Sequence, residues 1–336
     1  MAGERKRPEA PRTERVLPGV WRLRLPLPWP GVPHGNVWAV AADGGIVLFD
    51  TGIGGKGRMR QFDLALAQAG FGLEDVKLLV CTHSHTDHYG LAAPIVEGAG
   101  CELWMHPAWE HVRLLADDPA AAMEQRFEVG RQSGVPLSSL ERFRERRQDE
   151  EDTGIDAIVE PDRYLLPGVE VETDLGAWQV HETPGHAPSH VVLHQAKRKL
   201  MISGDHLLGR TVLFFDHGHT PDPVGEFLRS LDTIEPLAVG LVLPGHGRTF
   251  RDPKVKIEEA RRQVEEMLAK VRASLGEGER TAYEIVEDVV GPENVGNIGT
   301  VWVLQIVLSC LDHLAILGEV AKVEGTDPQR WRRAGR

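Results

Sequence analysis

The segment Thr82–Gly90, THSHTDHYG, carries four side chains of metal-binding types within six residues: His83, His85, Asp87 and His88. It follows KLLVC, a continuous apolar run typical of a strand buried on both faces. Imidazole and carboxylate groups are the ligands that borderline metals such as zinc prefer. A lone histidine is more often structural, but packing does not explain four such side chains on one turn. The segment therefore predicts a metal site at the end of a strand.

Further candidate ligands follow apolar runs later in the chain. His186 lies in TPGHAPSH, Asp205 in ISGDHLL and His246 in LPGHG. Each stands at the end of a run, where a strand would deliver it to a shared edge. Upstream, the run LFDTG places Asp50 in the same kind of position.

These motifs, in this order, resemble the HxHxDH signature and accompanying motifs of the metallo-β-lactamase superfamily over residues 16–251. The resemblance implies an α+β fold, the αββα sandwich of that superfamily. It also implies two divalent metal ions that together activate a water molecule. Zinc is the expected metal, although a set of His and carboxylate ligands also accepts iron or manganese.

The resemblance also implies a role for each ligand. Seven side chains form two metal sites and a bridge: His83, His85 and His186 for the first metal; Asp87, His88 and His246 for the second; Asp205 between them. Asp87 is in addition the expected catalytic residue, which would orient the water or take its proton. Asp50 is expected to hydrogen-bond to a ligand and fix its orientation.

The chain around these motifs divides into three parts. Residues 1–14 predict a disordered lead-in without a signal peptide. Residues 15–255 are expected to form the catalytic domain, with strands over 16–80 interrupted by a helix at 58–69. Residues 256–330 predict a small helical domain resembling a winged helix. It has a helix at 257–275, a capping box at Thr281 and Glu284, a long apolar helix and a short final strand.

Residues 106–164 differ in character from the strands on either side. The stretch is helical and rich in Glu and Arg, and it ends in the acidic run QDEEDTG. We interpret it as an insertion over one end of the sheets, where lids and substrate walls lie, with Trp109 as a candidate wall residue. The alternative is a solvated helical decoration without contact to substrate.

The remaining histidines receive weaker interpretations. His34 is a candidate substrate contact, His190 a strand residue near the site, and His206 a candidate pocket residue. His217 and His219, in FFDHGH, either line the mouth of the cleft or occupy a loop. Five others are interpreted as structural: His106, His111, His181, His194 and His313.

Composition narrows the class of partner. The formal net charge of −12 disfavours binding to nucleic acid or anionic membranes. We expect a small-molecule substrate, no nucleic-acid or membrane partner, and a chain compatible with a homodimer. Three cysteines are too few for a disulfide framework, which favours the cytoplasm. Ile298–Leu317 is apolar, but it contains Asp312 and therefore predicts a buried helix rather than a membrane span.

The predicted activity is hydrolysis of a small thioester, ester or lactone. The resemblance is to the glyoxalase II-like branch with a C-terminal winged-helix-like domain. That branch commonly has a histidine where this chain has Ser84, and its basic glutathione-binding residues are not recognisable here. Two alternatives stay open: an iron-dependent oxidoreductase acting on oxygen or persulfides, and a nuclease that cleaves RNA or another phosphodiester. A non-catalytic binding module would have lost ligands, and this set is intact.

Overall fold

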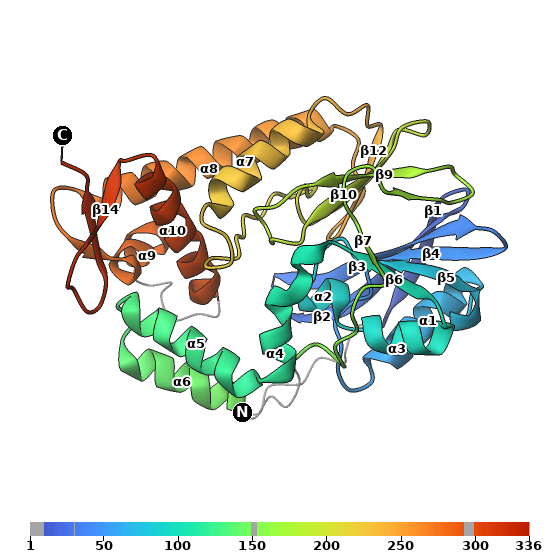
Figure 1. The fold of residues 1–336 in the computed structure, drawn as a ribbon, viewed down its shortest axis with the longest axis horizontal. Coiled ribbons are helices and arrows are strands. Elements are labelled where there is room, and N and C mark those ends of the chain that lie inside the picture. The colour runs from blue at the N-terminus through green and yellow to red at the C-terminus, as the bar shows by residue number, and fades with distance from the viewer. Residues whose placement is uncertain (1–9, 30, 149–152, 292–298, 336) are drawn as a thin grey trace.

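Two β-sheets stack face to face in the computed structural model, which describes residues 10–29, 31–148, 153–291 and 299–335 (Figure 1). The first sheet has the strand order β1-β2-β3-β4-β5-β6-β7 and the second β12-β11-β10-β9-β8. The first sheet contains β1 (Arg12–Leu17), β2 (Val20–Trp29), β3 (Val32–Ala42), β4 (Gly45–Phe49), β5 (Val76–Val80), β6 (Glu102–Met105) and β7 (Arg163–Tyr164). The second contains β8 (Glu170–Val171), β9 (Trp178–Glu182), β10 (Val191–Gln195), β11 (Leu200–Gly204) and β12 (Leu241–Pro244).

Helices cover the outer face of each sheet. Phe62 of α1 (Arg58–Ala69) and Ile95 of α3 (Ala92–Ala99) pack on the first sheet. Helices α7 (Pro223–Ile234) and α8 (Pro253–Leu275) pack on the second. Between the sheets, the rings of Phe49 and Trp178 are 5.7 Å apart in a third apolar cluster. Four layers, helix, sheet, sheet and helix, confirm the predicted αββα sandwich.

Local sequence fixes where several helices begin and end. The predicted helix 58–69 is α1, which stops at Gly70 because that residue adopts a left-handed φ of 86°. In α7, Pro223 occupies the first turn and the Asp222 carboxylate accepts from the Gly225 backbone N–H. The predicted capping box of Thr281 and Glu284 opens α9 (Ala282–Val290).

Strands from both sheets end at one edge of the sandwich. β5 of the first sheet and β9, β11 and β12 of the second all run into loops there. Backbone hydrogen bonds join these ends: Val191 donates to the Thr82 carbonyl at 2.8 Å, and Gly245 donates to that of Gly204 at 2.8 Å. Side chains that follow these strands are therefore brought together, although Thr82 and Gly245 are 163 positions apart in the sequence.

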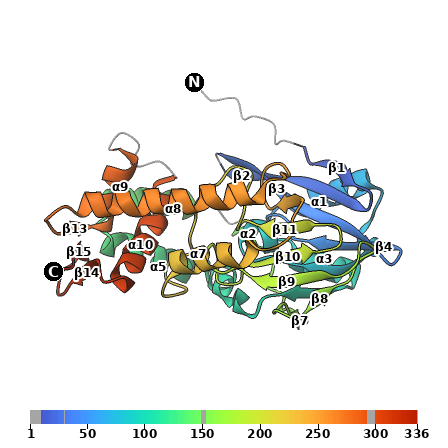
Figure 2. The ribbon, with the colours of Figure 1, turned by 90° about the horizontal axis from the view of Figure 1, so that it is seen from above.

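The helical C-terminal region continues the core of the second sheet. α8 runs from the sandwich to the far end of the molecule (Figure 2), where α9 and α10 (Gly299–Ile316) pack on it. A third sheet follows, with β13 (Arg280–Thr281), β14 (Val320–Val323) and β15 (Arg330–Arg333) in the order β13-β15-β14. The predicted final strand is β14, but β15 follows and pairs with it, so the prediction that this strand ends the fold was wrong. The likeness to a winged helix stays a prediction, as do the domain boundaries. Among the described residues, no helix is both long and apolar enough to cross a membrane.

Among its described residues, the segment 106–164 contains a 3-10 helix (Pro107–Val112) followed by α4 (Arg113–Asp117), α5 (Pro119–Gln132) and α6 (Leu137–Gln148). They contact the C-terminal region, since Tyr283 N donates to the Ser133 carbonyl at 2.9 Å and Gln329 N to that of Gln132 at 2.8 Å. Trp109 is only 2% exposed, because it packs in the core beside Tyr89. Its proposed position in a substrate wall was therefore wrong.

The disorder predicted for the last residues of the lead-in was wrong. Residues 12–14 belong to β1, which pairs with β2 from Arg12 opposite Arg24 to Leu17 opposite Val20. Polar residues form a strand here because the partner strand satisfies their backbone groups. Residues 1–9 lie outside the described residues.

Candidate metal centre

The first cluster of ligand-type side chains lies on the turn after β5. α2 (Thr86–Tyr89) begins directly after His85 and carries Asp87 and His88 on one short turn. Gly90 is required at its end, because a Cβ there would overlap the backbone of Gly54, Thr86 and Gly154. The sequence THSHTDHYG thus folds into a compact turn held against two other loops.

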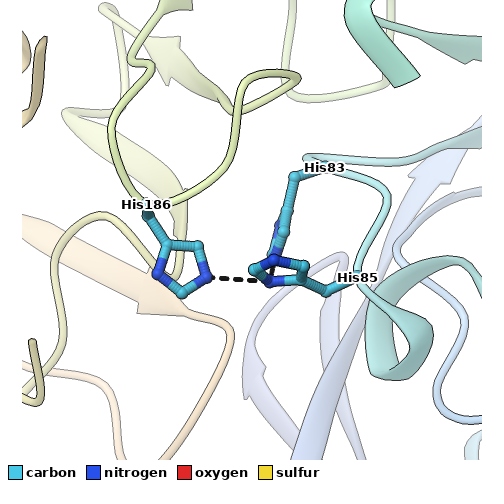
Figure 3. Close-up of side chains that lie close together, drawn as sticks. All are labelled: His83, His85 and His186. Atoms are coloured by element: carbon cyan, nitrogen blue, oxygen red, sulfur yellow. Dashed lines mark hydrogen bonds between the residues drawn. The ribbon is translucent and has the colours of Figure 1, made fainter. Parts of the chain in front are cut away.

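Three imidazoles meet at one side of this turn (Figure 3). His83 Nε2 lies 3.0 Å from His85 Nδ1, and His186 Nε2 lies 3.0 Å from the same atom. His186 comes from the loop between β9 and β10, so the second sheet completes a group that the first begins. Burial and neighbouring histidines lower the pKa of His83 well below its ordinary value, and that of His186 to about 4. Neutral rings with free lone pairs are the form that binds a cation.

A second group combines Asp87, His88 and His246, whose ligand atoms lie within 4.8 Å of one another. His246 Nε2 is 3.2 Å from Asp87 Oδ2, and His88 Nε2 is 3.6 Å from it. Burial lowers the pKa of His246, but Asp205 and Asp87 outweigh it and raise that pKa to about 10. These two carboxylates would be the counter-charges of a cation at this position.

Asp205 lies between the two groups. Its Oδ2 is 3.7 Å from His186 Nε2 and 3.0 Å from His246 Nε2, and its Oδ1 is 3.5 Å from His88 Nε2. Burial opposes ionisation of Asp205, yet His246 and His88 hold its pKa well below the ordinary value. Contact with members of both groups agrees with a bridging role, and the assignment of ligands to metals stays a prediction.

Unpartnered atoms test whether this cluster fits metal ions. Asp87 Oδ2, His88 Nε2 and Asp205 Oδ1 are buried without a hydrogen-bond partner. A buried polar atom without a partner costs about 1–3 kcal/mol, so three in one place need a common ligand. Because these atoms belong to the two clusters above, divalent cations would satisfy all of them, and the residues fit the metals that the sequence predicts.

Asp50 holds the cluster from behind. Its Oδ2 accepts from His88 Nδ1 at 2.8 Å, and its Oδ1 accepts from the Thr82 backbone N–H at 2.7 Å. Asp50 has a φ of 67°, a conformation that these contacts hold in place. The predicted hydrogen bond between Asp50 and a candidate ligand is confirmed, and it leaves His88 Nε2 facing the centre.

The other histidines near the centre support the cluster. The carbonyl of His34 accepts from His246 Nδ1 at 2.9 Å, so its main chain orients a candidate ligand. Both ring nitrogens of His190 are engaged, one with Thr183 and one with the Asp205 backbone N–H. His190 lies directly before β10, so it supports the site from a loop and is not itself a strand residue. His206 lines a cavity of about 10 Å³, room for about one water molecule, beside His186.

Sequence reasoning missed two residues of the site. Asp216 Oδ2 accepts from His85 Nε2 at 2.7 Å. The other ring nitrogen of His85, Nδ1, is the one that lies near His83 and His186. His111 Nε2 lies 3.6 Å from the same oxygen and 3.1 Å from Ser84 Oγ. The interpretation of His111 as merely structural was wrong, because the turn after β6 brings it to the site. Asp216 stands in FFDHGH, a motif of which only the histidines were predicted to lie near the site.

The two histidines of that motif lie in different surroundings. His217 Nε2 bonds to Asp312 Oδ2 at 2.8 Å and so ties this loop to α10, whereas the His219 ring lies 5.1 Å from that of His111. The four remaining histidines lie apart from the cluster: His106 bonds to Glu182, His313 to Asp222 and His194 to a backbone carbonyl, and His181 lies beside His194.

Three aromatic rings lead away from the cluster. Phe214 lies 5.6 Å from the His85 ring and 5.5 Å from the His186 ring, measured between centroids. Trp302 of α10 lies 5.8 Å from Phe214, and Trp29 at the end of β2 lies 6.4 Å from Trp302. We name Trp29, Phe214 and Trp302 the aromatic wall. It gives the centre an apolar side, built in part by the C-terminal region.

The comparisons with known proteins agree with this geometry. The profile of the metallo-beta-lactamase superfamily matches residues 30–246. A structure of a metallo-beta-lactamase family protein from Thermus thermophilus superposes with a TM-score of 0.79 at 26% identity, covering 95% of this chain and 100% of that one. The chain therefore belongs to the metallo-beta-lactamase superfamily.

Three of the curated relatives are named as hydrolases or thioesterases. The probable metallo-hydrolase YqjP of Bacillus subtilis is 26% identical over 80% of this chain and 83% of its own length. The human acyl-coenzyme A thioesterase MBLAC2 is 27% identical over 64% of this chain and 74% of its own. The hydroxyacylglutathione hydrolase GloC of Haemophilus influenzae is 26% identical over 52% of this chain and 69% of its own length. Membership and the His/Asp cluster together indicate a metallo-hydrolase with divalent metal ions.

Replacing Asp205 with Asn tests the bridge. The substitution keeps the shape but removes the charge that both groups share, so we expect both metals to bind more weakly, by about tenfold or more. The measurement is metal stoichiometry by mass spectrometry after dialysis against a series of chelator concentrations. Retention of two metals with wild-type affinity would contradict the bridging role.

Removal of Asp216 tests the contact that sequence reasoning missed. Asp216→Ala frees His85 Nε2, and loss of such a supporting carboxylate lowers metal affinity by about 10–100-fold. Glu182→Ala is the matched control, because it breaks a similar pair of a histidine and a carboxylate at His106, apart from the cluster. Competition with a chromogenic chelator measures the metal affinity of both variants. Equal affinities of the two variants would show that Asp216 does not support the metal centre.

Proposed function

We propose that this chain is a metal-dependent hydrolase that cleaves an acyl thioester, with esters and lactones as chemically related substrates. The observation that carries the proposal is the contact between a complete set of seven metal-type ligands and the aromatic wall. The cluster supplies the means to attack a carbonyl, and Phe214, beside His85 and His186, offers an apolar surface to the acyl group.

The named relatives support a thioester over other hydrolysable bonds. Two of them are named for removing an acyl group from a carrier, one from coenzyme A and one from glutathione. Aromatic side chains bury large apolar areas, so an acyl chain that lies along the aromatic wall would leave water favourably. Trp302 extends this surface from α10, which gives the C-terminal region a part in substrate binding.

The residues of the chain then divide the work of hydrolysis. When bound, the two metals would lower the pKa of a water molecule and polarise the acyl carbonyl. Asp87 accepts the proton that this water releases as its oxygen adds to the acyl carbon. The bond between carbon and sulfur breaks, and the thiol leaves with a proton that Asp87 returns. Buried groups around Asp87 keep bulk water away from this exchange.

A substrate panel tests the proposed function directly. Metal-loaded protein would be assayed on acyl thioesters, oxygen esters, lactones, a β-lactam and a phosphodiester, and for oxygen uptake with iron bound. We expect kcat/KM to be highest for thioesters with apolar acyl groups. Greatest turnover of the phosphodiester, or oxygen uptake without hydrolysis, would favour one of the two alternative activities.

Asp87→Asn separates catalysis from metal binding. The amide keeps an oxygen that can face a metal but cannot take a proton, so we expect kcat to fall by about 10² or more. Metal content should fall less, because His88, His246 and Asp205 remain. Turnover and stoichiometry are measured on the same preparation. Normal turnover would exclude the catalytic role, and loss of one metal in step with activity would leave Asp87 as a ligand only.

Trp302→Ala tests the aromatic wall. Loss of part of an apolar surface worth about 1.5–3 kcal/mol should lower kcat/KM for a long-chain acyl thioester by about tenfold. The acetyl thioester is the control, since it is too short to reach from the cluster past Phe214, and Trp302→Phe should restore most of the activity. An equal loss on both substrates would mean that Trp302 serves only packing.

A further inference from the structure

Four arginines gather beside the metal centre on the first two strands and on the segment after β12. A cavity of about 360 Å³ is lined by Glu14, Arg22, Arg24, Arg248 and Thr249. Arg12 lies directly opposite Arg24 on β1. The chain as a whole has a net charge of −12, whereas the charged residues that line this cavity are mainly basic. We name it the arginine pocket.

The strand register leaves the positive charges unbalanced. Residues directly opposite one another in an antiparallel pair share a face, and like charges there are destabilising. Glu14 lies opposite Arg22 and pairs with it at 2.7 Å, whereas Arg12 faces Arg24. Within the ranges that the structure describes, neither Arg24 nor Arg248 forms an ion pair with a carboxylate. Among the described residues, one acidic side chain, that of Glu14, thus lines the cavity with three arginines, and a fourth arginine, Arg12, lies opposite Arg24 in the strand register.

Arg22, inside the arginine pocket, also lacks partners for its charge and for one of its N–H groups. Its side chain is only 6% exposed, and its Nε has no hydrogen-bond partner, although Nη1 donates to the Gly247 carbonyl at 2.8 Å. Burial lowers the pKa of Arg22, Glu14 raises it, and Arg24 and Arg248 lower it further. A buried unpaired N–H group and unrelieved repulsion between cations would both be satisfied by an anion with several acceptor oxygens.

Hydrogen bonds connect the arginine pocket to the metal centre. Arg248 and Thr249 follow His246 on one short segment, and Arg22 holds that segment through Gly247. Arg24 Nη2 lies 3.1 Å from His34 Nδ1, and the carbonyl of His34 accepts from His246 Nδ1. The volume of the cavity falls within the range of small-ligand sites, about 300–1,000 Å³. A ligand group in the pocket would therefore lie next to a candidate metal ligand.

We propose that the arginine pocket binds a phosphate group. Guanidinium groups match phosphate by paired N–H···O contacts, and phosphate offers more acceptor oxygens than a carboxylate does. The phosphate would come either from the carrier half of an acyl thioester such as an acyl-coenzyme A, or from free phosphate. Only the first source rests on the proposed thioesterase function.

Substrates with and without phosphate distinguish these sources. Arg24→Gln and Arg248→Gln, singly and together, would be assayed with metal bound on an acyl-coenzyme A and on the uncharged N-acetylcysteamine thioester of the same acyl group. For a carrier phosphate, KM for the acyl-coenzyme A rises by about tenfold or more in the double variant, while kcat/KM for the uncharged thioester is unchanged. Arg251→Gln, on the same segment but not lining the cavity, should change neither.

Calorimetric titration with inorganic phosphate provides the second measurement. Wild-type protein should bind phosphate more tightly than the double variant at equal metal content, which separates the arginine pocket from the metals. Loss of this binding with an unchanged KM would indicate free phosphate as the ligand. Unchanged phosphate affinity together with an unchanged KM for the acyl-coenzyme A would overturn the proposal. If wild-type protein cleaves no thioester, the thioesterase proposal fails. The titration then still shows whether the arginine pocket binds phosphate.

Discussion

Mutual compensation of buried charges is the constraint on which the site depends. Asp50, Asp87 and Asp205 are removed from water at the ends of strands, where an isolated carboxylate would lose its charge. Asp87 and Asp205 stay ionised because imidazoles lie against them. His88 contacts both of these carboxylates and that of Asp50. The strands of both sheets must therefore end at one edge, and the packing between the sheets keeps them there.

The supporting contacts come from distant parts of the chain. Asp216 reaches His85 across 131 residues, and the carbonyl of His34 reaches His246 across 212. The loop that carries Asp216 is tied to α10 by the bond between His217 and Asp312. The geometry of the centre is thus coupled to the C-terminal region, whose helices also share one apolar core with the second sheet.

Two surfaces of opposite chemistry flank the centre. The aromatic wall begins beside His186 and ends at Trp29, and the arginine pocket begins beside His246. A substrate with an apolar acyl group and an anionic carrier would satisfy both. Burial of the acyl group and pairing of the anion are different sources of binding energy, and the carbonyl between them would be held over the metals.

The sequence by itself determined the sandwich and the seven candidate ligands, since strand ends and local motifs carry that information within a few residues. THSHTDHYG alone places four side chains on one turn, because the spacing along a turn fixes which groups face together. Only the tertiary structure brought Asp216 and His111 to His85, buried Trp109, and placed Arg24 opposite Arg12. No local pattern specifies such contacts, because they depend on strand register and on how distant elements pack.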